Sequence, residues 1–364
     1  MRRILVVTGS LRVGGLEKVA VSCMRYADRS NLSFDFLVFG NDSDGYANEV
    51  REMGGRIIQI PHSSNPIKHL KNVMGVMKKY GKYDIVHSHI FFNSGIIMLA
   101  AFLQCIPVRI AHAHSIKRKG TSLKKRVLFC GLRFLLKFFT TIPCACSSQA
   151  GNYLFGKALF SNKGVIVPNI VDVDKFAFSE EARKQIRQKY GIKDTDIVLG
   201  QVGRLVASKN QRFLLRLFAE YLKVNASAKL LLVGDGDMKS ELLALTKELD
   251  IQEGVIFAGT QTNVPDYLSA MDVFVCTSTN EGLGIVLLEA QANGLHCIAE
   301  VSAIVDEVIN LHNTIVVDGF RDFQMWISKI QDCKDLRNEQ SFVSLMKTSS
   351  FTEDGLKKVI AELY

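Results

Sequence analysis

Residues 4 to 15 read Ile4-Leu5-Val6-Val7-Thr8-Gly9-Ser10-Leu11-Arg12-Val13-Gly14-Gly15, an apolar run that ends in a loop with three glycines. Four apolar residues are too few for the core of a signal peptide but suit a buried β-strand. The segment that follows, Gly15 to Ala27, has apolar residues at helical spacing. A strand that passes through a loop into a helix is the first unit of an α/β fold with a parallel sheet.

The same alternation continues along the chain and restarts after residue 190. In the first half the pattern predicts strands at Ile4–Val7, Phe34–Phe39, Arg56–Ile60, Ile85–His87, Val108–Ala111 and Gly164–Val167, and helices at Gly15–Ala27, Ile67–Lys79 and Leu123–Phe139. In the second half it predicts strands at Ile197–Val202, Lys229–Val233, Val255–Phe257, Val273–Cys276, Cys297–Glu300 and Thr314–Val317, and helices at Asn210–Leu222, Met238–Leu249, Val264–Ala270, Gly284–Asn293, Phe323–Asp332 and Glu353–Tyr364.

The chain therefore divides into two predicted domains. Its 364 residues are about twice the usual length of one domain. We expect an N-terminal Rossmann-like domain at 1–170 and a C-terminal one at 171–349, which face a cleft. Pro168–Asp172 is the predicted hinge, and the final helix, within 350–364, is expected to pack back on the first domain.

Composition narrows the class of protein. Hydrophobic residues make up 48% of the chain and charged residues 22%, which is typical of a globular protein. No run approaches the roughly 18 apolar residues of a transmembrane helix. The eight cysteines are scattered, and Cys144-Ala145-Cys146 has no second pair at metal-ligand spacing. We expect a cytoplasmic protein with reduced thiols, no cofactor and no metal.

The charge is unevenly distributed. Residues 1 to 170 contain 24 Lys and Arg against 8 Asp and Glu, a net charge of +16, whereas the remainder contains 21 against 28, a net charge of −7. The first half is therefore expected to meet a polyanion or an anionic membrane surface.

Three loops carry candidate chemistry, because α/β sheets bind ligands where their strands end. Gly14 and Gly15 leave backbone N–H groups free at a helix start, which favours a phosphate, although a simple tight turn explains them equally well. Arg204 and Lys209 follow a strand five residues apart, where two cations can clamp a diphosphate, and ordinary surface cations are the alternative.

The third loop joins a strand to an apolar helix and contains two glutamates. Glu281 lies at the predicted strand end, and Glu289 falls about two turns along the following helix. A carboxylate accepts hydrogen bonds from paired hydroxyls, as a ribose or hexose presents them. The alternative for Glu289 is a surface position, but its apolar neighbours indicate a largely buried helix on which a carboxylate needs a polar partner.

Together these loops resemble glycosyltransferase family four, whose sugar-retaining members include bacterial capsule and exopolysaccharide enzymes. Seven residues separate Glu281 from Glu289, a spacing typical of the family. The resemblance covers nearly the whole chain through Gly14-Gly15, His114, Pro168-Asn169, Asp172, Phe176, Gly203-Arg204, Lys209, Gly234-Asp235-Gly236 and the glutamate pair. It implies the two-domain GT-B fold and hexose transfer from a nucleotide-diphosphate sugar, with UDP-sugars favoured and GDP-sugars next.

The resemblance also implies a role for each matching residue. Arg204 and Lys209 would bind the donor diphosphate in place of a metal, Glu281 would contact the transferred sugar, and Glu289 would bind the ribose. The other residues implied in the donor site are Gly14, Gly15, Gly203, Gly234, Gly259, Thr260, Gly282, Leu283, Gly284, Ile285 and Val286.

A histidine near the sugar is a further feature of this family. His112 and His114 both follow the strand Val108–Ala111, and alternation along a strand places both on one face. We favour His114 and leave His112 open. His87 and His89 end another strand in the same way, and a hydrogen-bonded structural role is the preferred interpretation for both.

The segment 117–139 has eight basic residues and no acidic one. Lys117, Arg118, Lys119, Lys124, Lys125 and Arg126 precede a wide apolar stripe at helical spacing. A helix with one face in the core is one interpretation, and contact with anionic lipid or with the acceptor is the other. We therefore expect a peripheral protein at the inner face of the cell membrane, with a saccharide acceptor linked to a polyprenyl diphosphate.

Two other classes of function compete with this interpretation. A Rossmann oxidoreductase is disfavoured because neither half has the full dinucleotide glycine spacing followed by a ribose-binding acid. A nucleic-acid-binding protein is disfavoured because the aromatic residues lie in apolar helical stripes. A non-catalytic nucleotide-sugar-binding protein is the remaining alternative, and the presence of Arg204, Lys209, Glu281 and Glu289 favours turnover.

Overall fold

The computed structural model describes residues 1–12, 14–40, 45–114, 123–279, 281, 283–301, 314–333, 344, 346, 347, 349 and 351–364, without the side chains of 123–125. The chain forms two compact units. Unit 1 comprises Met1–Asn169 and Glu353–Tyr364, and unit 2 comprises Ile170–Thr352. The border between Asn169 and Ile170 lies one residue before the predicted one.

Unit 1 is built on a seven-stranded sheet in which every pair of neighbouring strands is parallel. The strand order is β3-β2-β1-β4-β5-β6-β7. The strands are β1 Arg2–Val7, β2 Leu32–Phe39, β3 Arg56–Ile60, β4 Ile85–Ser88, β5 Val108–Ala113, β6 Ile142–Ala145 and β7 Val165–Ile166. Central strands such as β4 are buried along their whole length, which is expected of a parallel sheet covered on both faces.

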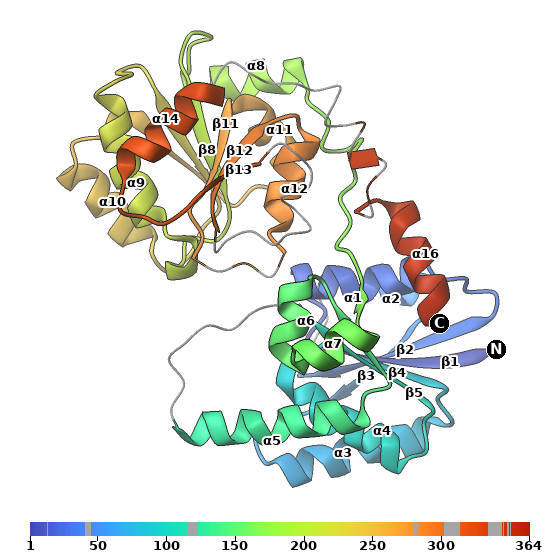
Figure 1. Cartoon of the computed structure of the whole chain (residues 1–364). Helices are drawn as coiled ribbons and strands as arrows, with labels where there is room; N and C mark the ends of the chain where they lie inside the picture. Colours follow the sequence, from blue (N-terminus) through green and yellow to red (C-terminus); the bar gives the residue numbers. More distant parts are fainter. Residues whose placement is uncertain are drawn as a thin grey trace. The chain divides into compact units, whose positions relative to one another are not determined.

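Helices cover both faces of this sheet. Figure 1 shows α3, α4 and α5 on one face and α1, α2 and α16 on the other. The helices of unit 1 are α1 Gly15–Arg25, α2 Ala47–Glu52, α3 Pro66–Tyr80, the short 3₁₀ helix η1 Phe91–Asn93, α4 Ser94–Leu103, α5 Leu123–Phe139, α6 Ser148–Phe155, α7 Lys157–Lys163 and α16 Glu353–Leu363. The start of α3 is explained by its local sequence. The side chain of Asn65 accepts hydrogen bonds from the N–H groups of Ile67 and Lys68, and Pro66 is the first residue of the helix.

Unit 2 contains a six-stranded parallel sheet in the order β10-β9-β8-β11-β12-β13. Its strands are β8 Val198–Val202, β9 Lys229–Val233, β10 Val255–Gly259, β11 Val273–Cys276, β12 His296–Glu300 and β13 Thr314–Val317. Its helices are α8 Glu180–Lys189, η2 Ala207–Lys209, α9 Gln211–Leu222, α10 Lys239–Glu248, η3 Gln252–Gly254, α11 Val264–Ala270, α12 Ile285–Ala292 and α14 Phe323–Cys333.

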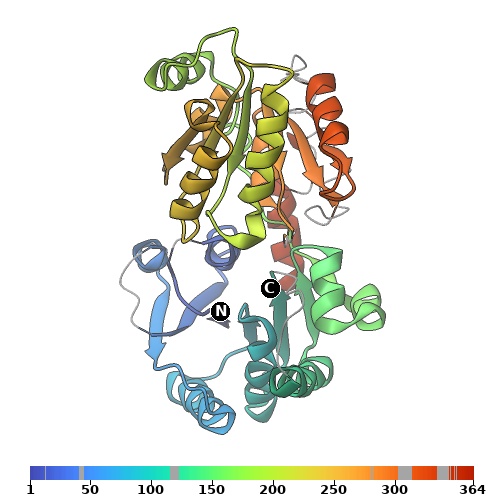
Figure 2. The same ribbon diagram turned by 90° about the vertical axis from the view of Figure 1, so that its left-hand side faces the viewer.

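The helices of unit 2 also form two layers. Figures 1 and 2 show α9, α10 and α14 on one face of the sheet and α11 and α12 on the other. Between α9, α14 and the sheet lies an apolar core that includes Phe213, Phe218 and the single tryptophan of the chain, Trp326, which is fully buried. Trp326 Nε1 donates to the carbonyl oxygen of Gly319, so the one polar atom of this side chain is paired.

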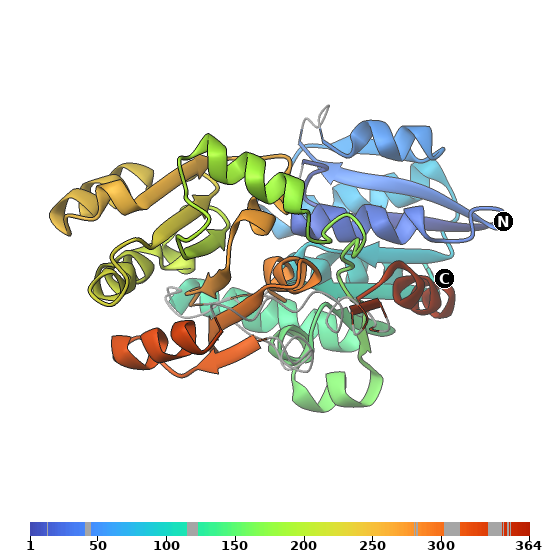
Figure 3. The same cartoon turned by 90° about the horizontal axis from the view of Figure 1, so that it is seen from above.

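The segment after unit 2 returns to unit 1, as predicted for the final helix. In Figure 3 the dark red α16 ends near the N-terminus of the chain, and Tyr364 contacts Phe34 of β2. Leu356 and Ile360 of α16 are buried, and Arg2 Nη1 donates to the carbonyl oxygen of Tyr364. None of the helices in the described part of the chain is both long and apolar enough to cross a membrane.

Candidate active site

The strand order of unit 2 identifies where a ligand can bind. β8 and β11 are neighbours, and the connections lead away from them in opposite directions, to β9 and β10 on one side and to β12 and β13 on the other. The loops that leave the carboxyl ends of two such strands separate and leave a crevice between them, where α/β sheets commonly hold their ligands. Lys209 follows β8 and Glu281 follows β11, so both predicted residues lie at this position.

Lys209 and Glu281 form an ion pair. Lys209 Nζ donates to Glu281 Oε1, and Ser278 Oγ donates to the same oxygen over 2.7 Å. The Lys209 side chain is 20% exposed and that of Glu281 is 14% exposed, so both are screened from bulk water yet reach the surface. The ammonium group of Lys209 has three N–H donors, so Lys209 can also bind a diphosphate, and if it turned away from Glu281 this carboxylate could accept other hydrogen bonds.

A buried hydrogen-bond network fixes the backbone around Lys209. Thr277 Oγ1 donates to the carbonyl oxygen of Lys209 over 3.0 Å, and Gln201 Nε2 donates to Thr277 Oγ1 over 3.1 Å. Asn210, between η2 and α9, has a left-handed conformation with φ of 53°. Gln201, Thr277 and Ser278 were not among the predicted site residues. The detectable signal was a pair of small polar residues directly after the buried strand β11.

Backbone packing joins the loops that follow β8, β9 and β10. Gly203 N–H donates to the carbonyl of Val233, and Gly234 N–H donates to that of Gly259, over 2.9 and 2.8 Å. Gly234 has φ of 136°, and a Cβ atom there would overlap the carbonyl oxygen of Gly203. Glycine is therefore required by this close approach.

Arg204 lies on the same loop but does not join the ion pair. Its side chain is exposed and has no ion pair among the residues that the structure describes. Its carbonyl oxygen accepts a hydrogen bond from Gln211 Nε2 over 3.1 Å, so its backbone is fixed while its guanidinium remains at the surface. Thr260, directly after β10, is also exposed.

The second glutamate lies on α12 as predicted. This helix begins after Gly284, whose φ of 74° is in the left-handed region. Leu283 and Val286 are buried, whereas Ile285 and Glu289 are partly exposed. Glu289 takes part in a polar interaction and is not an isolated carboxylate. Gly282 lies outside the described residues.

In unit 1 the equivalent position lies between β1 and β4. Gly14 precedes α1 in an extended conformation, and Gly15 is the first residue of this helix. Lys18 N–H donates to the carbonyl oxygen of Gly14, so the N–H groups of the first turn point out of the helix.

Four histidines gather at the ends of β4 and β5. His87 Nε2 lies 3.3 Å from His112 Nδ1, and His89 Nδ1 lies 2.8 Å from His114 Nε2. Three of the four, His87, His89 and His112, are fully buried, whereas His114 is partly exposed. Burial lowers the pKa of His87 and of His114 to about 3, and it lowers the pKa of His89 and His112 well below its ordinary value. All four rings are therefore neutral near pH 7.

One group in the described part of the chain has the composition of a metal site. His87, His89 and His112 each offer a ring nitrogen, and these nitrogens lie within 4.8 Å of one another. Cys144 and Cys146, the pair considered from the sequence, are buried and lie outside this group.

The basic segment is only partly described. Lys117, Arg118 and Lys119 lie outside the described residues, as do the side chains of Lys124 and Lys125, while Arg126 is exposed. In α5, Leu132 and Leu136 are buried, and the backbone at Leu132 closely approaches Gly95 of α4. Its other face is apolar and exposed: Val127 is 67%, Phe134 56% and Phe138 66% accessible. One face of α5 is therefore buried, as the first interpretation predicts, while contact of the exposed apolar face with lipid or acceptor stays a prediction.

Comparison with known proteins identifies two family descriptions that match the chain. The family description "Glycosyltransferase Family 4" matches residues 13–175, and "Glycosyl transferases group 1" matches residues 182–341. These ranges lie almost entirely in unit 1 and unit 2, respectively.

Similar full-length proteins include the putative glycosyltransferase EpsF of Bacillus subtilis, 35% identical over 82% of this chain and 78% of that protein. The UDP-Gal:alpha-D-GlcNAc-diphosphoundecaprenol alpha-1,3-galactosyltransferase of Escherichia coli is 28% identical over 72% of this chain and 68% of its own length. A crystal structure of Anabaena HepE with UDP-glucose has the same fold, with a TM-score of 0.80, 19% identity and coverage of 100% and 99% of the two chains. The chain belongs to glycosyltransferase family four and has the GT-B fold.

Proposed function

We propose that this glycosyltransferase moves a hexose from a nucleotide-diphosphate sugar to a saccharide acceptor with retention of the anomeric configuration. The observation that carries the proposal is the pair of Lys209 and Glu281 at the crevice between β8 and β11. A cation and a carboxylate in contact can exchange partners when a ligand offers a diphosphate to one and hydroxyl groups to the other.

The donor site would work by this exchange. Lys209 would move from Glu281 to the diphosphate, with the exposed Arg204 as the second cation, and both would stabilise the charge of the departing nucleoside diphosphate. Glu281, still held by Ser278, would accept a hydroxyl of the sugar. Since two cations take the leaving charge, the proposed reaction requires no metal.

The other predicted residues complete this donor site. The N–H groups from Gly282 to Val286 would face sugar and phosphate at the start of α12, and Glu289 would bind the ribose hydroxyls. Gly259 and Thr260 would lie beside the base, and Gly203 and Gly234 bring the loops together. In unit 1, Gly14 and Gly15 would offer N–H groups to a phosphate, and the partial exposure of His114 supports its selection over the buried His112.

We infer that the donor is a UDP-sugar, with GDP-sugars as the next candidates. The Escherichia coli relative is named for UDP-galactose, and the similar Anabaena structure holds UDP-glucose. The retaining reaction follows on one face of the sugar, and the leaving phosphate assists removal of the proton from the acceptor hydroxyl.

We further infer a lipid-linked acceptor in polysaccharide biosynthesis at the inner face of the cell membrane. The same relative acts on a diphosphoundecaprenol-linked sugar. The exposed apolar face of α5, beside Arg126 and the predicted basic loop, would lie in the interface of an anionic bilayer.

Ligand binding and turnover test the proposal together. Thermal unfolding with UDP, GDP and ADP sugars should show stabilisation by the matching donor, because a ligand that binds only the folded state raises its stability. Lys209→Ala and Arg204→Ala should each lower kcat of sugar transfer by about 10²- to 10³-fold, the usual loss of a charge-stabilising group. Lys329→Ala, which removes an exposed lysine of α14, is the matched control. Near-normal rates in both site variants would sink the proposed site.

A further inference from the structure

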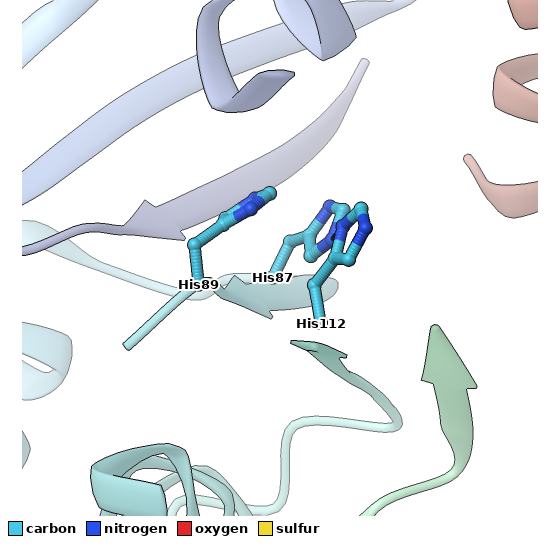
Figure 4. Close-up of side chains that lie close together, drawn as sticks. All are labelled: His87, His89 and His112. Carbon is cyan, nitrogen blue, oxygen red and sulfur yellow. Dashed lines mark hydrogen bonds between the residues drawn. The ribbon is translucent and has the colours of Figure 1, made fainter. Parts of the chain in front are cut away.

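The four histidines of unit 1 form two hydrogen-bonded pairs that stack on each other. The inner pair is His87 with His112, and the outer pair is His89 with His114. His89 stacks on His87 with ring centroids 4.2 Å apart, and His114 stacks on His112 at 4.1 Å. Figure 4 shows how three of these side chains project from adjacent strand ends. The rings of one pair stack on the rings of the other, so the rings of one pair cannot rotate unless those of the other pair move as well.

Tyr364 lies at the base of this array. Its hydroxyl is 2.6 Å from His87 Nδ1, the ring nitrogen of His87 that faces away from His112. The tyrosine side chain is buried, and its ring contacts Phe34 edge to face at 5.7 Å. The position of Tyr364 is fixed by α16 and by Arg2, which donates to its carbonyl oxygen.

In a hydrogen-bonded row of neutral imidazoles, the tautomer of one ring determines the tautomer of the next. Each neutral ring has one N–H and one bare nitrogen, so a hydrogen bond at one nitrogen decides the role of the other. A phenol is a strong donor and an imidazole nitrogen a strong acceptor. The Tyr364 hydroxyl also has a hydrogen bond with the Cys23 thiol. Donation from Tyr364 to His87 Nδ1 is the arrangement that we take, and it places the His87 proton on Nε2, from which it is donated to His112 Nδ1.

We propose that Tyr364 is a positioning residue that sets the tautomer of His87 and His112 and, through the stacked outer pair, the ring plane of His114. The proposal rests on the proposed function, in which His114 faces the sugar. His89 holds His114 directly, over 2.8 Å, while Tyr364 fixes the inner pair against which both rings rest. The function of α16 is thus to complete the histidine array as well as to cover the sheet.

The geometry favours hydrogen bonds over a metal ion among these histidines. Both nitrogens of His87 already have partners, the Tyr364 hydroxyl and His112 Nδ1. A metal lies in the plane of each imidazole that it binds, and the rings of His87 and His89 lie face to face, 30° from parallel. A metal bound to all three would have to replace these hydrogen bonds.

Tyr364→Phe in the full chain tests the proposal, since it removes one hydroxyl and keeps the buried ring. Tyr26→Phe is the control. Tyr26 and Tyr364 line one pocket beside α16, and Tyr26 has no hydrogen bond to the four histidines. In ¹⁵N spectra of histidine-labelled protein, the wild type should show one tautomer each for His87 and His112. Tyr364→Phe should shift these signals toward mixed tautomers, and kcat should fall about tenfold, as expected of a displaced site group, with little change in KM for the donor.

Three results would overturn the proposal. One is an unchanged tautomer of His87 and His112 in Tyr364→Phe, and another is an equal loss of kcat in Tyr26→Phe. The third is stoichiometric zinc in the purified chain, because a metal on these nitrogens would replace the hydrogen bonds. A wild-type chain that neither binds nor transfers nucleotide sugars would contradict the proposed function instead, and the nitrogen spectra alone would then decide whether Tyr364 sets the array.

Discussion

Glu281 Oε1 accepts hydrogen bonds from Lys209 Nζ and Ser278 Oγ at the proposed sugar-nucleotide site. If Lys209 moves to the diphosphate, Ser278 becomes the group that keeps the carboxylate in place. Ser278→Ala should therefore lower kcat/KM of sugar transfer by about tenfold, because a hydrogen bond to a charged group contributes about 1.5 to 3 kcal/mol. The measurement is steady-state transfer at several donor concentrations.

The control for this variant is Ser227→Ala, which removes an exposed hydroxyl that bonds only Asn225. Fluorescence of Trp326 verifies that unit 2 remains folded in both proteins. A value of kcat/KM within about twofold of wild type in Ser278→Ala would show that Ser278 does not hold Glu281 during transfer.

At the residue scale, the sequence predicted where the charged side chains of unit 2 lie, but it did not predict the polar residues that hydrogen-bond to them or to their backbone. Lys209 and Glu281 could be predicted to lie at strand ends because each follows an apolar run, and the structure brings them into an ion pair. Their roles toward a diphosphate and a sugar stay predictions. Thr277 and Gln201 were missed because buried polar residues of this kind are common, and only the fold brings them to the backbone of Lys209. The pairing of His89 with His114 was missed for a similar reason, since strand alternation relates residues along one strand and does not give contacts between two.

At the scale of elements, α5 offers the next test. Its exposed face includes Phe134 and Phe138, whose rings are 4.3 Å apart. Replacing both by glutamate removes apolar surface and adds negative charge where anionic lipid is expected. Flotation with phosphatidylglycerol vesicles should show at least a tenfold loss of bound protein, about 1.4 kcal/mol.

Leu243→Glu provides the matched control, because Leu243 is an exposed apolar residue of α10 in unit 2. Neutralising Lys124, Lys125 and Arg126 tests the electrostatic part, for which each basic residue near the surface contributes about 1 kcal/mol. Equal flotation of the wild type and the Phe134, Phe138 double variant would contradict membrane contact through this face.

The predicted elements were most accurate where apolar periodicity was strong. The predictions for α5 and α11 match the observed bounds, that for α9 differs by one residue at its start, and that for α10 differs by one residue at each end. We missed β6, because its four residues include Pro143 and resemble a turn. α4 was missed because Ile96 to Ala101 are apolar on nearly every side and give no helical stripe.

At the scale of the whole molecule, the histidines make stability depend on pH. In the unfolded chain a histidine binds its proton near pH 6.5. The folded chain keeps His87 neutral down to a pKa of about 3, so below pH 6.5 the unfolded state binds more protons. The free energy of unfolding of unit 1 should therefore fall as the pH falls, by up to about 1.4 kcal/mol per pH unit for each such histidine.

Urea unfolding at pH 7.5, 6.5 and 5.5 measures this effect. Six of the eight histidines lie in unit 1, whereas Trp326 reports unit 2. Far-ultraviolet circular dichroism should show a transition that moves to lower urea as the pH falls, while the fluorescence transition of Trp326 moves less. A unit 1 transition that stays in place between pH 7.5 and 5.5 would contradict the burial of four neutral histidines.

The division of unit 1 between residues 1–169 and 353–364 also has a consequence for synthesis on the ribosome. Unit 2 is continuous in sequence and can fold as soon as it has emerged from the ribosome. Unit 1 can complete its fold only when α16 has been made, and α16 is synthesised after unit 2. Until then Phe34 and His87 lack their contacts with Tyr364. The nascent chain would thus expose part of an apolar sheet while unit 2 is translated, and this is the interval in which a chaperone would be needed.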